Sequence, residues 1–155
     1  MPQITHILVP TDGSELSLEA ARYARMLANA TNARVSLLTV LDEDAVIPGA
    51  WAGIGGDVPG FGGASVKAVR AEMESLAQRE QLDKTAALLG DLDAPTFKAL
   101  RWGHAATTIC GYAEEIGADL IVMGSHGRTG LKAALLGSVS LGVLSRAERP
   151  VLIVR

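Results

Sequence analysis

The sequence predicts an α/β protein, a single doubly wound sheet of five parallel strands with helices on both faces. Three observations lead to this fold class. Short, mostly apolar runs recur along the 155 residues, and stretches with apolar residues at three- and four-residue spacing separate them. Glycine or polar turn residues follow several of the apolar runs. Alternating strands and amphipathic helices are typical of crossover units in a parallel sheet.

The first part of the chain predicts two strands with a helix between them. The run Ile4–Val9 ends at Pro10 and indicates a buried strand, and Arg34–Leu41 indicates a second one. A helix is expected from Ser14 onward because the apolar spacing changes there. The residues expected to form its buried stripe are Leu16, Ala20, Tyr23, Ala24 and Leu27.

Residues 42–64 are crowded with glycine and proline and predict a long loop. The loop also contains three large apolar residues, Trp51, Ile54 and Phe61. Two interpretations stay open. The loop is either simply flexible, with partial docking of these side chains, or it forms a lid over a ligand.

The second part of the chain predicts three more strands and three more helices. The strands are expected at Thr96–Trp102, Asp119–Met123 and Pro150–Val154, and the first is the least apolar and therefore nearest an edge. The first of the three helices runs towards Leu82 or beyond, and its apolar stripe is Val66, Val69, Met73 and Leu76. The second stops at Gly117, and its stripe is Ala105, Ile109, Ala113 and Ile116. The third begins near Gly137–Ser138, and its apolar residues are Val139, Val143 and Leu144. No internal repeat or linker divides the chain, so residues 1–155 are expected to form one domain.

The composition argues against several classes of function. A net charge of -3 and only 4% aromatic residues do not match the basic surface and stacking platforms of a nucleic-acid binder. No apolar stretch approaches a membrane span, and the N-terminus lacks the basic region of a secretion signal. The single cysteine, Cys110, fits a reducing cytoplasm and is interpreted as a small, partly buried side chain.

Candidate binding residues follow the first two strands. Ligands of such sheets bind beyond the carboxyl ends of the strands. Pro10, Thr11 and Asp12 stand at the first carboxyl end, where Asp12 could serve ribose hydroxyls or a phosphate-bound metal ion. The alternative is that Asp12 or Ser14 merely caps the next helix. At the end of the second strand, backbone groups of Thr39–Asp42 could meet a purine, with apolar side chains on either side of its ring.

The most specific signal is the pattern Gly124-x2-Gly127-x9-Gly137-Ser138. Glycines after a strand let a phosphate approach the backbone, and a helix start favours an anion. Ser138 and Ser140 could donate to phosphate oxygens, although Ser138 is also an ordinary helix cap. Arg128 could offset phosphate charge or be simply solvated, and His126 is expected to be exposed rather than catalytic. The candidate residues around this cradle are Met123, Gly124, His126, Gly127, Arg128, Gly137, Ser138, Val139 and Ser140.

Other nucleotide and catalytic motifs are missing from the sequence. It contains no Gly-x4-Gly-Lys-Ser/Thr phosphate loop, no Gly-x-Gly-x-x-Gly fingerprint and no Gly-x-Ser-x-Gly elbow. The three histidines show no metal-ligand spacing with one another or with Cys110. No catalytic residue is therefore assigned.

The chain resembles the universal stress protein family, specifically its ATP-binding branch. The resemblance is carried by Ile7–Ser14, by Ala118–Arg128, by Leu136–Ser140 and by Arg149–Val154. It implies a Rossmann-like fold of the adenine nucleotide alpha hydrolase type, with ATP and Mg²⁺ as cofactors. It also implies that Asp12 serves ribose or the metal and that Val40 meets adenine through its backbone. It also implies a homodimer formed through the last strand, residues 151–154. The chain departs from many relatives at Gly103-His104-Ala105, where they have Gly-x-Pro.

The resulting hypothesis is a cytoplasmic, ATP-binding stress or signalling module that binds neither nucleic acid nor membranes. Two alternatives stay open. One is an enzyme that slowly hydrolyses ATP or transfers its phosphate, which would need a base near the phosphates. The other is an interaction module that works without the nucleotide.

Overall fold

Five parallel strands form the sheet of this computed structural model, which describes residues 3–42, 65–127 and 136–155. They are β1 (His6–Pro10), β2 (Arg34–Leu41), β3 (Thr96–Trp102), β4 (Leu120–Gly124) and β5 (Val151–Val154). Their order across the sheet is β3-β2-β1-β4-β5. The chain therefore adds strands on one side of β1 and then crosses to its other side, which confirms the doubly wound α/β prediction.

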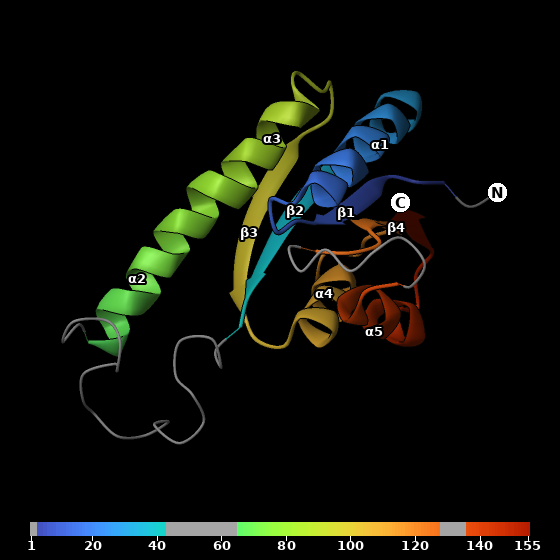
Figure 1. Cartoon of the computed structure of the whole chain (residues 1–155). Helices are drawn as coiled ribbons and strands as arrows, with labels where there is room; N and C mark the ends of the chain where they lie inside the picture. Colours follow the sequence, from blue (N-terminus) through green and yellow to red (C-terminus); the bar gives the residue numbers. More distant parts are fainter. Residues whose placement is uncertain (1–2, 43–64, 128–135) are drawn as a thin grey trace.

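Helices cover both faces of this sheet (Figure 1). They are α1 (Glu15–Thr31), α2 (Val66–Ala77), the π-helical turn η2 (Gln78–Asp83), α3 (Lys84–Leu89), α4 (Ala105–Glu115) and α5 (Ser138–Arg146). Helices α1 and α3 pack together over one face, and α4 and α5 pack together over the other. Among the described residues, no helix is both long enough and apolar enough to cross a membrane.

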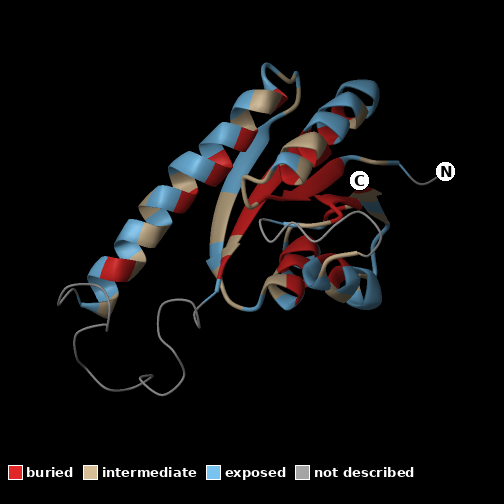
Figure 2. Ribbon diagram, in the orientation of Figure 1, coloured by how far each residue is buried: buried red, intermediate tan, exposed pale blue. Residues whose placement is uncertain are grey.

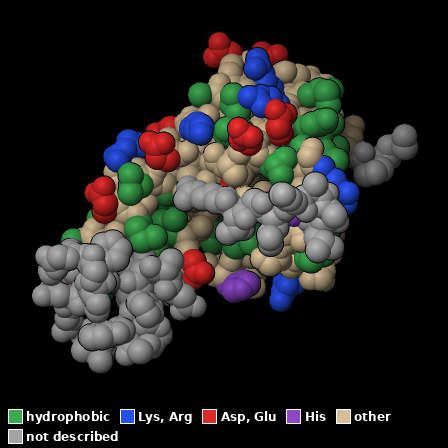
Figure 3. Space-filling model, in the orientation of Figure 1, with side chains coloured by type: hydrophobic (Ala, Val, Ile, Leu, Met, Phe, Trp, Pro, Cys, Tyr) green, Lys and Arg blue, Asp and Glu red, His purple; other side chains and the backbone are tan. Residues whose placement is uncertain are grey.

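The central strands are buried on both faces, as Figure 2 shows in red. Successive side chains of a strand point to opposite faces of the sheet. In β1, Ile7 and Val9 accordingly pack under α1, whereas Leu8 packs under α4. This double burial explains why the runs are almost continuously apolar rather than alternating. On the face seen in Figure 3, acidic and basic side chains are intermixed over the described residues.

Most predicted strands lie where the sequence placed them. The bounds of β2 and β3 are as predicted, and β3 is an edge strand as expected. The other three strands each begin later than predicted, β1 by two residues. Ile4 precedes β1 and packs against the core from outside the strand.

Four predicted core positions and one predicted helix need correction. Val139 and Leu144 of α5 are exposed, and Val143 alone of its predicted stripe is buried. Tyr23 and Leu76 are exposed, because the buried faces of α1 and α2 are lined instead by small residues such as Ala21 and Ala77. The helix predicted to run past Leu82 does so, but its middle widens into the π-helical turn η2. Gly117 ends α4 as predicted, with φ of 62°. The loop predicted at residues 42–64, interpreted as either flexible or a lid, lies outside the described residues from position 43 onward, and so do Trp51, Ile54 and Phe61.

Candidate functional site

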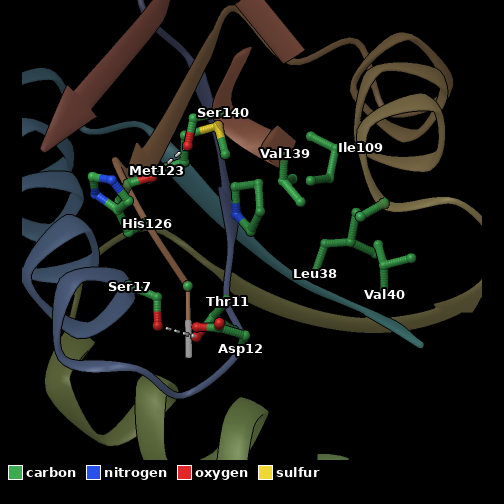
Figure 4. A pocket seen from close by; sticks show the side chains of 14 residues that line it. Thr11, Asp12, Ser17, Leu38, Val40, Ile109, Met123, His126, Val139 and Ser140 are labelled. Atoms are coloured by element: carbon green, nitrogen blue, oxygen red, sulfur yellow. Dashed lines mark hydrogen bonds between the residues drawn. The ribbon is translucent and has the colours of Figure 1, made fainter. Parts of the chain in front are cut away.

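A pocket opens where the strand order reverses, beyond the carboxyl ends of β1 and β4. It has a volume of about 570 Å³, including the part open to solvent. Segments far apart in the chain meet there, as Figure 4 shows. The pocket is lined by Pro10, Thr11, Asp12, Ser17, Leu38, Val40, Ala105, Ile109, Met123, Gly124, His126, Gly127, Val139 and Ser140.

One side of the pocket is an apolar wall that includes Leu38, Val40 and Ile109 (Figure 4), and Ala105 also lines the pocket. Leu38 and Val40 are two residues apart on β2, so their side chains point to the same face of the sheet. Ala105 and Ile109 are four residues apart at the start of α4 and share one helix face. The wall therefore follows from the packing of α4 over β2, and it presents a surface suited to an apolar or aromatic ring.

The opposite side contains the Thr11–Asp12–Gly13 turn, which joins β1 to α1. Asp12 Oδ1 accepts a hydrogen bond from the Ser14 N–H at 3.0 Å, so the carboxylate closes its own turn. Ser14 is the N-cap of α1, and its hydroxyl accepts from the Ser17 N–H at 3.4 Å. Of the two residues considered as caps, Ser14 therefore occupies the cap position, and Asp12 lies in the pocket lining.

His126 lies at the rim of this polar side and is partly buried, in contrast to the exposed position expected from the sequence. Its Nδ1 is 3.0 Å from the Ser125 hydroxyl oxygen. Its Nε2 is buried and has no hydrogen-bond partner among the described residues. A buried polar atom without a partner is uncommon, and a ligand group is one way to satisfy it.

The glycines of the cradle have different structural roles from one another. A Cβ at Gly127 would lie 2.5 Å from Asp12 Oδ2, so this glycine lets the chain pass close to the carboxylate. A Cβ at Gly124 would lie 2.9 Å from the backbone of Leu16. Gly124 therefore admits the first turn of α1 against the end of β4, and its role in admitting a phosphate stays a prediction.

The start of α5 also differs from the sequence interpretation. Gly137, not Ser138, is the N-cap, and Gly137 N–H donates to Ser125 O at 2.8 Å. Ser138 is the exposed first residue of the helix. Ser140 is buried, and its hydroxyl donates to Gly124 O at 3.0 Å and to Ser125 O at 2.9 Å. Its single hydrogen is engaged there, so the interpretation of Ser140 as a phosphate donor is not supported.

Most of the predicted binding residues meet in the pocket. The exceptions are Gly137 and Ser138, which are not in its lining, and Arg128, which lies outside the described residues. Whether the lining residues bind a ligand stays a prediction. Cys110 is outside the lining and is buried, with Sγ 4.0 Å from Val143 O, and burial raises the pKa of its thiol.

Four lining residues were missed by the sequence interpretation: Ser17, Leu38, Ala105 and Ile109. Signals for three of them were present. Leu38 shares a face with Val40 because strands alternate, and Ala105 and Ile109 belong to the predicted helix stripe at the end that reaches the crevice. No pattern in the sequence singled out Ser17, which faces back towards the turn from inside α1.

The comparisons with known proteins agree with this geometry. The sequence profile of the Universal stress protein family matches residues 3–155. The chain belongs to the universal stress protein family. It is 38% identical to universal stress protein YxiE of Bacillus subtilis over 151 residues, covering 96% of this chain and 97% of the relative. It is 32% identical to universal stress protein MJ0577 of Methanocaldococcus jannaschii, covering 96% of this chain and 93% of the relative.

Solved structures of universal stress proteins share the fold. The structure of MJ0577 superposes with a TM-score of 0.81 at 27% identity, covering 99% of this chain and 96% of that chain. A universal stress protein in complex with cAMP superposes with a TM-score of 0.64 at 24% identity, covering 99% and 98%. Another, from Archaeoglobus fulgidus in complex with dAMP, has a TM-score of 0.61 at 19% identity and covers both chains fully.

Proposed function

We propose that this universal stress protein binds ATP in the pocket between β1 and β4. The observation that carries the proposal is the division of the pocket into an apolar wall and a polar side at the topological switch point. Family membership and the cAMP and dAMP complexes of proteins with this fold support an adenine nucleotide as the ligand class.

The apolar wall suits the adenine ring. Leu38 and Val40 from β2 and Ala105 and Ile109 from α4 would enclose its faces, and ring burial is favourable by about 25 cal/mol per Å² of apolar surface. The polar edge of the ring would then meet backbone groups near Val40. This assignment leaves ribose and phosphates on the side of Asp12, His126 and Gly127.

The polar side fits a nucleotide that carries Mg²⁺. Magnesium is usually held by one or two carboxylates together with substrate phosphates and waters, so a single carboxylate suffices. Asp12 supplies this carboxylate, and Gly127 allows the backbone of the cradle to pass close to it. Among the described residues, no cluster of three or more His, Cys, Asp or Glu side chains could hold an ion alone.

The proposed role is a cytoplasmic stress or signalling module whose state depends on the bound nucleotide. A ligand that binds one conformation more tightly shifts the population towards it. Binding is preferred to catalysis because the described lining contains only two titratable side chains, His126 and Asp12.

The first test identifies the ligand directly. Freshly purified protein is denatured, the released nucleotide is identified, and the protein is then titrated with ATP by calorimetry with and without Mg²⁺. Retained ATP, or saturable ATP binding strengthened by Mg²⁺, is the expected result. Released ADP or AMP would favour the slow hydrolase instead. No nucleotide and no heat of binding would contradict the proposal and favour a nucleotide-independent interaction module.

A matched pair of variants tests the apolar wall. Ala105→Trp fills the wall from the first residue of α4, whereas Thr107→Trp places the same side chain at an exposed position of that helix outside the lining. We expect Ala105→Trp to lower ATP affinity by more than about tenfold, equivalent to about 1.4 kcal/mol. Thr107→Trp should bind like the unchanged protein. Equal affinities in both variants would remove adenine from this wall.

We also propose a homodimer formed through β5. This strand pairs with β4 on one side and is an edge of the sheet on the other, where Leu152 is 36% exposed. Leu141 and Leu144 of α5, the helix that leads into β5, are exposed as well. Association would cover apolar surface and pair the free strand edge.

Sedimentation of two variants tests this assembly. Leu152→Lys places a charge on the β5 edge, and Phe97→Lys places one on the opposite edge, β3, at a residue that is 48% exposed. We expect Leu152→Lys to shift the protein towards monomer and Phe97→Lys to leave the dimer intact. A monomeric unchanged protein, or dissociation by Phe97→Lys alone, would contradict the assignment.

A further inference from the structure

We propose that Thr85 is a positioning residue of the nucleotide site. It acts on the site indirectly, by holding the Asp12 turn against the π-helical turn η2. Thr85 belongs to α3, is fully buried and does not line the pocket. The inference rests on the function proposed above, because it assigns Thr85 an effect on ligand affinity. Three features of the structure support it.

The first feature is a directed chain of hydrogen bonds. The Thr85 hydroxyl donates to Gln81 O at 2.6 Å. Its oxygen can therefore only accept from the Thr11 hydroxyl, which is 2.8 Å away. The Thr11 oxygen in turn accepts from Gly13 N–H at 3.2 Å. Because each hydroxyl has one hydrogen, the donors in this chain of hydrogen bonds all point the same way, from the Gly13 N–H through Thr11 and Thr85 to the Gln81 carbonyl of η2.

The second feature is direct backbone contact between the turn and η2. Gly13 has φ of 76°, and a Cβ on it would lie 2.7 Å from Glu80 O. Only glycine adopts this conformation without strain and leaves this space open. The Asp12 turn therefore lies against η2 without an intervening side chain.

The third feature is the π-helical turn itself. Hydrogen bonds connect its first and last residues and tie it to the sheet. Asp83 Oδ1 accepts from Gln78 Nε2 and from Lys98 Nζ, each at 2.8 Å, and Lys98 lies on β3. Such turns widen the helix by one residue and occur often at functional sites. Here Thr85 directly follows the widened segment, and its hydroxyl donates to the Gln81 carbonyl within that segment. The support for Asp12 thus extends from the loop through two buried threonines to an edge strand.

Side chains that orient ligand-binding groups from behind change affinity by about ten- to a hundredfold when they are altered. Replacing Thr85 by valine keeps its shape but removes the acceptor that ties the Thr11 hydroxyl to α3, and the Ser17 hydroxyl oxygen, 3.1 Å away within α1, remains as its acceptor. The link from the turn to η2 is then lost. The turn then loses its fixed position, and the Asp12 carboxylate with it. Serine at this position keeps the hydroxyl and should keep the chain of bonds.

The experiment measures ATP affinity with Mg²⁺ for the unchanged protein, Thr85→Val, Thr85→Ser and Thr31→Val. Thr31 serves as the control, because its hydroxyl makes the same bond to the carbonyl four residues earlier, at 2.9 Å to Leu27 O, but far along α1 from the turn. We expect Thr85→Val to bind about tenfold more weakly. Thr85→Ser should recover affinity to within about twofold, and Thr31→Val should be unaffected.

A double-mutant cycle separates positioning of Asp12 from general destabilisation. In an Asp12→Asn background, Thr85→Val should change ATP affinity by less than about twofold, because the group it positions is already altered. An undiminished tenfold loss there, or wild-type affinity of Thr85→Val alone, would overturn the inference. Failure of the unchanged protein to bind ATP would instead overturn the proposed function and, with it, this inference.

Urea unfolding of each variant verifies that it is folded at the titration temperature. Should Thr85→Val not fold, Thr85→Cys takes its place, since a thiol has similar size but bonds weakly. It is expected to bind ATP more weakly than Thr85→Ser, and equal affinity of these two variants would overturn the inference.

Discussion

The amino and carboxyl ends of the central strand pair β1–β4 carry the same residue types, but these residues have different roles at the two ends. At the amino end lie His6, Asp119 and Ser36, and at the carboxyl end lie His126, Asp12 and Ser125. The histidine and carboxylate at the amino end have several bonding partners. Those at the carboxyl end surround a pocket.

Bonds at the amino end satisfy the polar groups from within the fold. Asp119 Oδ2 accepts from the backbone N–H and hydroxyl of Thr5 and from the backbone N–H of His6, at 2.7–3.0 Å. His6 Nδ1 donates to Ile116 O at 3.1 Å, so its Nε2 accepts from the Ser36 hydroxyl at 2.8 Å. The side chains here are committed to holding strands and loops together.

At the carboxyl end, the histidine differs in one respect. His126 Nε2 has no hydrogen-bond partner among the described residues, although the ring is held at Nδ1. The comparison teaches that residue type alone does not mark a site. Position relative to strand direction does, because the crevice of a doubly wound sheet forms only beyond the carboxyl ends.

The strongest way to break the carboxyl end is Gly124→Val. The new side chain would collide with the backbone of Leu16, so we expect the free energy of unfolding to fall by about 3 kcal/mol. Gly111→Ala in α4 is the control, since a Cβ there meets nothing within 4 Å and helix propensity favours alanine by up to about 1 kcal/mol. Urea unfolding measures both, and a fully stable Gly124→Val would contradict the packing role.

Replacing the two aspartates tests the comparison directly. Asp119→Ala leaves three donors without their acceptor, so we expect it to lower the free energy of unfolding by about 1–2 kcal/mol without changing ATP affinity. Asp12→Ala should lower ATP affinity by about tenfold, most clearly with Mg²⁺, and cost less stability. Calorimetry and urea unfolding of both proteins give the four values. The same pattern in both variants would erase the distinction between the ends.

The amino end should also make stability depend on pH. Burial lowers the pKa of His6, assisted by the charge of Arg34 and opposed by its bond to Ile116 O and by Asp119. The folded chain then binds this proton more weakly than the unfolded chain. Stability from His6 is complete above the unfolded pKa of about 6.5 and falls as pH drops through the folded value, by at most about 1.4 kcal/mol per pH unit.

Asp119 extends this dependence to lower pH. Hydrogen bonds from the Thr5 side chain and backbone lower the pKa of Asp119, so its contribution is present above about pH 4 and is lost as pH falls through its folded pKa. Urea unfolding between pH 8 and pH 3 measures both contributions. His6→Gln should flatten the decline below pH 6.5, and His104→Gln, at an exposed histidine, should retain it. An unchanged decline in His6→Gln would contradict the assignment.

The smallest expected effect concerns the imidazole ring of His126 at the carboxyl end, and it tests whether the orientation of this ring matters for ATP binding. Ser125→Ala removes the hydroxyl beside His126 Nδ1 and frees the ring to turn. We expect ATP affinity to fall by about threefold, within the range of one ordinary hydrogen bond. Ser145→Ala, which removes an exposed hydroxyl of α5, is the control. Equal affinity of both variants would show that the Ser125 contact does not orient the ring for binding.

The sequence predicted the sheet well because each strand is locally distinctive. Runs such as Arg34–Leu41 are apolar on both faces, and turn residues delimit them. The edge position of β3 was predictable because Thr96, Lys98 and Arg101 make it the least apolar of the five runs. Tyr23 was misplaced because helical spacing gives a periodicity but does not show which neighbouring stripe faces the sheet, and the alanine stripe packs there.

The site was predictable in location but less so in detail. The motif identified the Asp12 and Gly124–Gly127 segments, since glycines and turn residues are visible in sequence. It could not show that Gly124 faces a helix backbone or that Ser140 donates to carbonyl groups, because both depend on how distant segments pack. The Thr11–Thr85 bond joins residues 74 positions apart, and no local pattern announces such a contact.

The central place of β1 has a consequence for a chain that is still being synthesised. Its first partner in the sheet, β2, comes next in the sequence after the single helix α1. Its second partner, β4, begins only at Leu120. A nascent chain can therefore assemble β1, α1 and β2 early, through contacts that are close in sequence. The lining of the pocket runs from Pro10 to Ser140 in the sequence, so the pocket forms only after Ser140 has been synthesised. A ligand captured there would stabilise only the finished domain, not its partly made precursors.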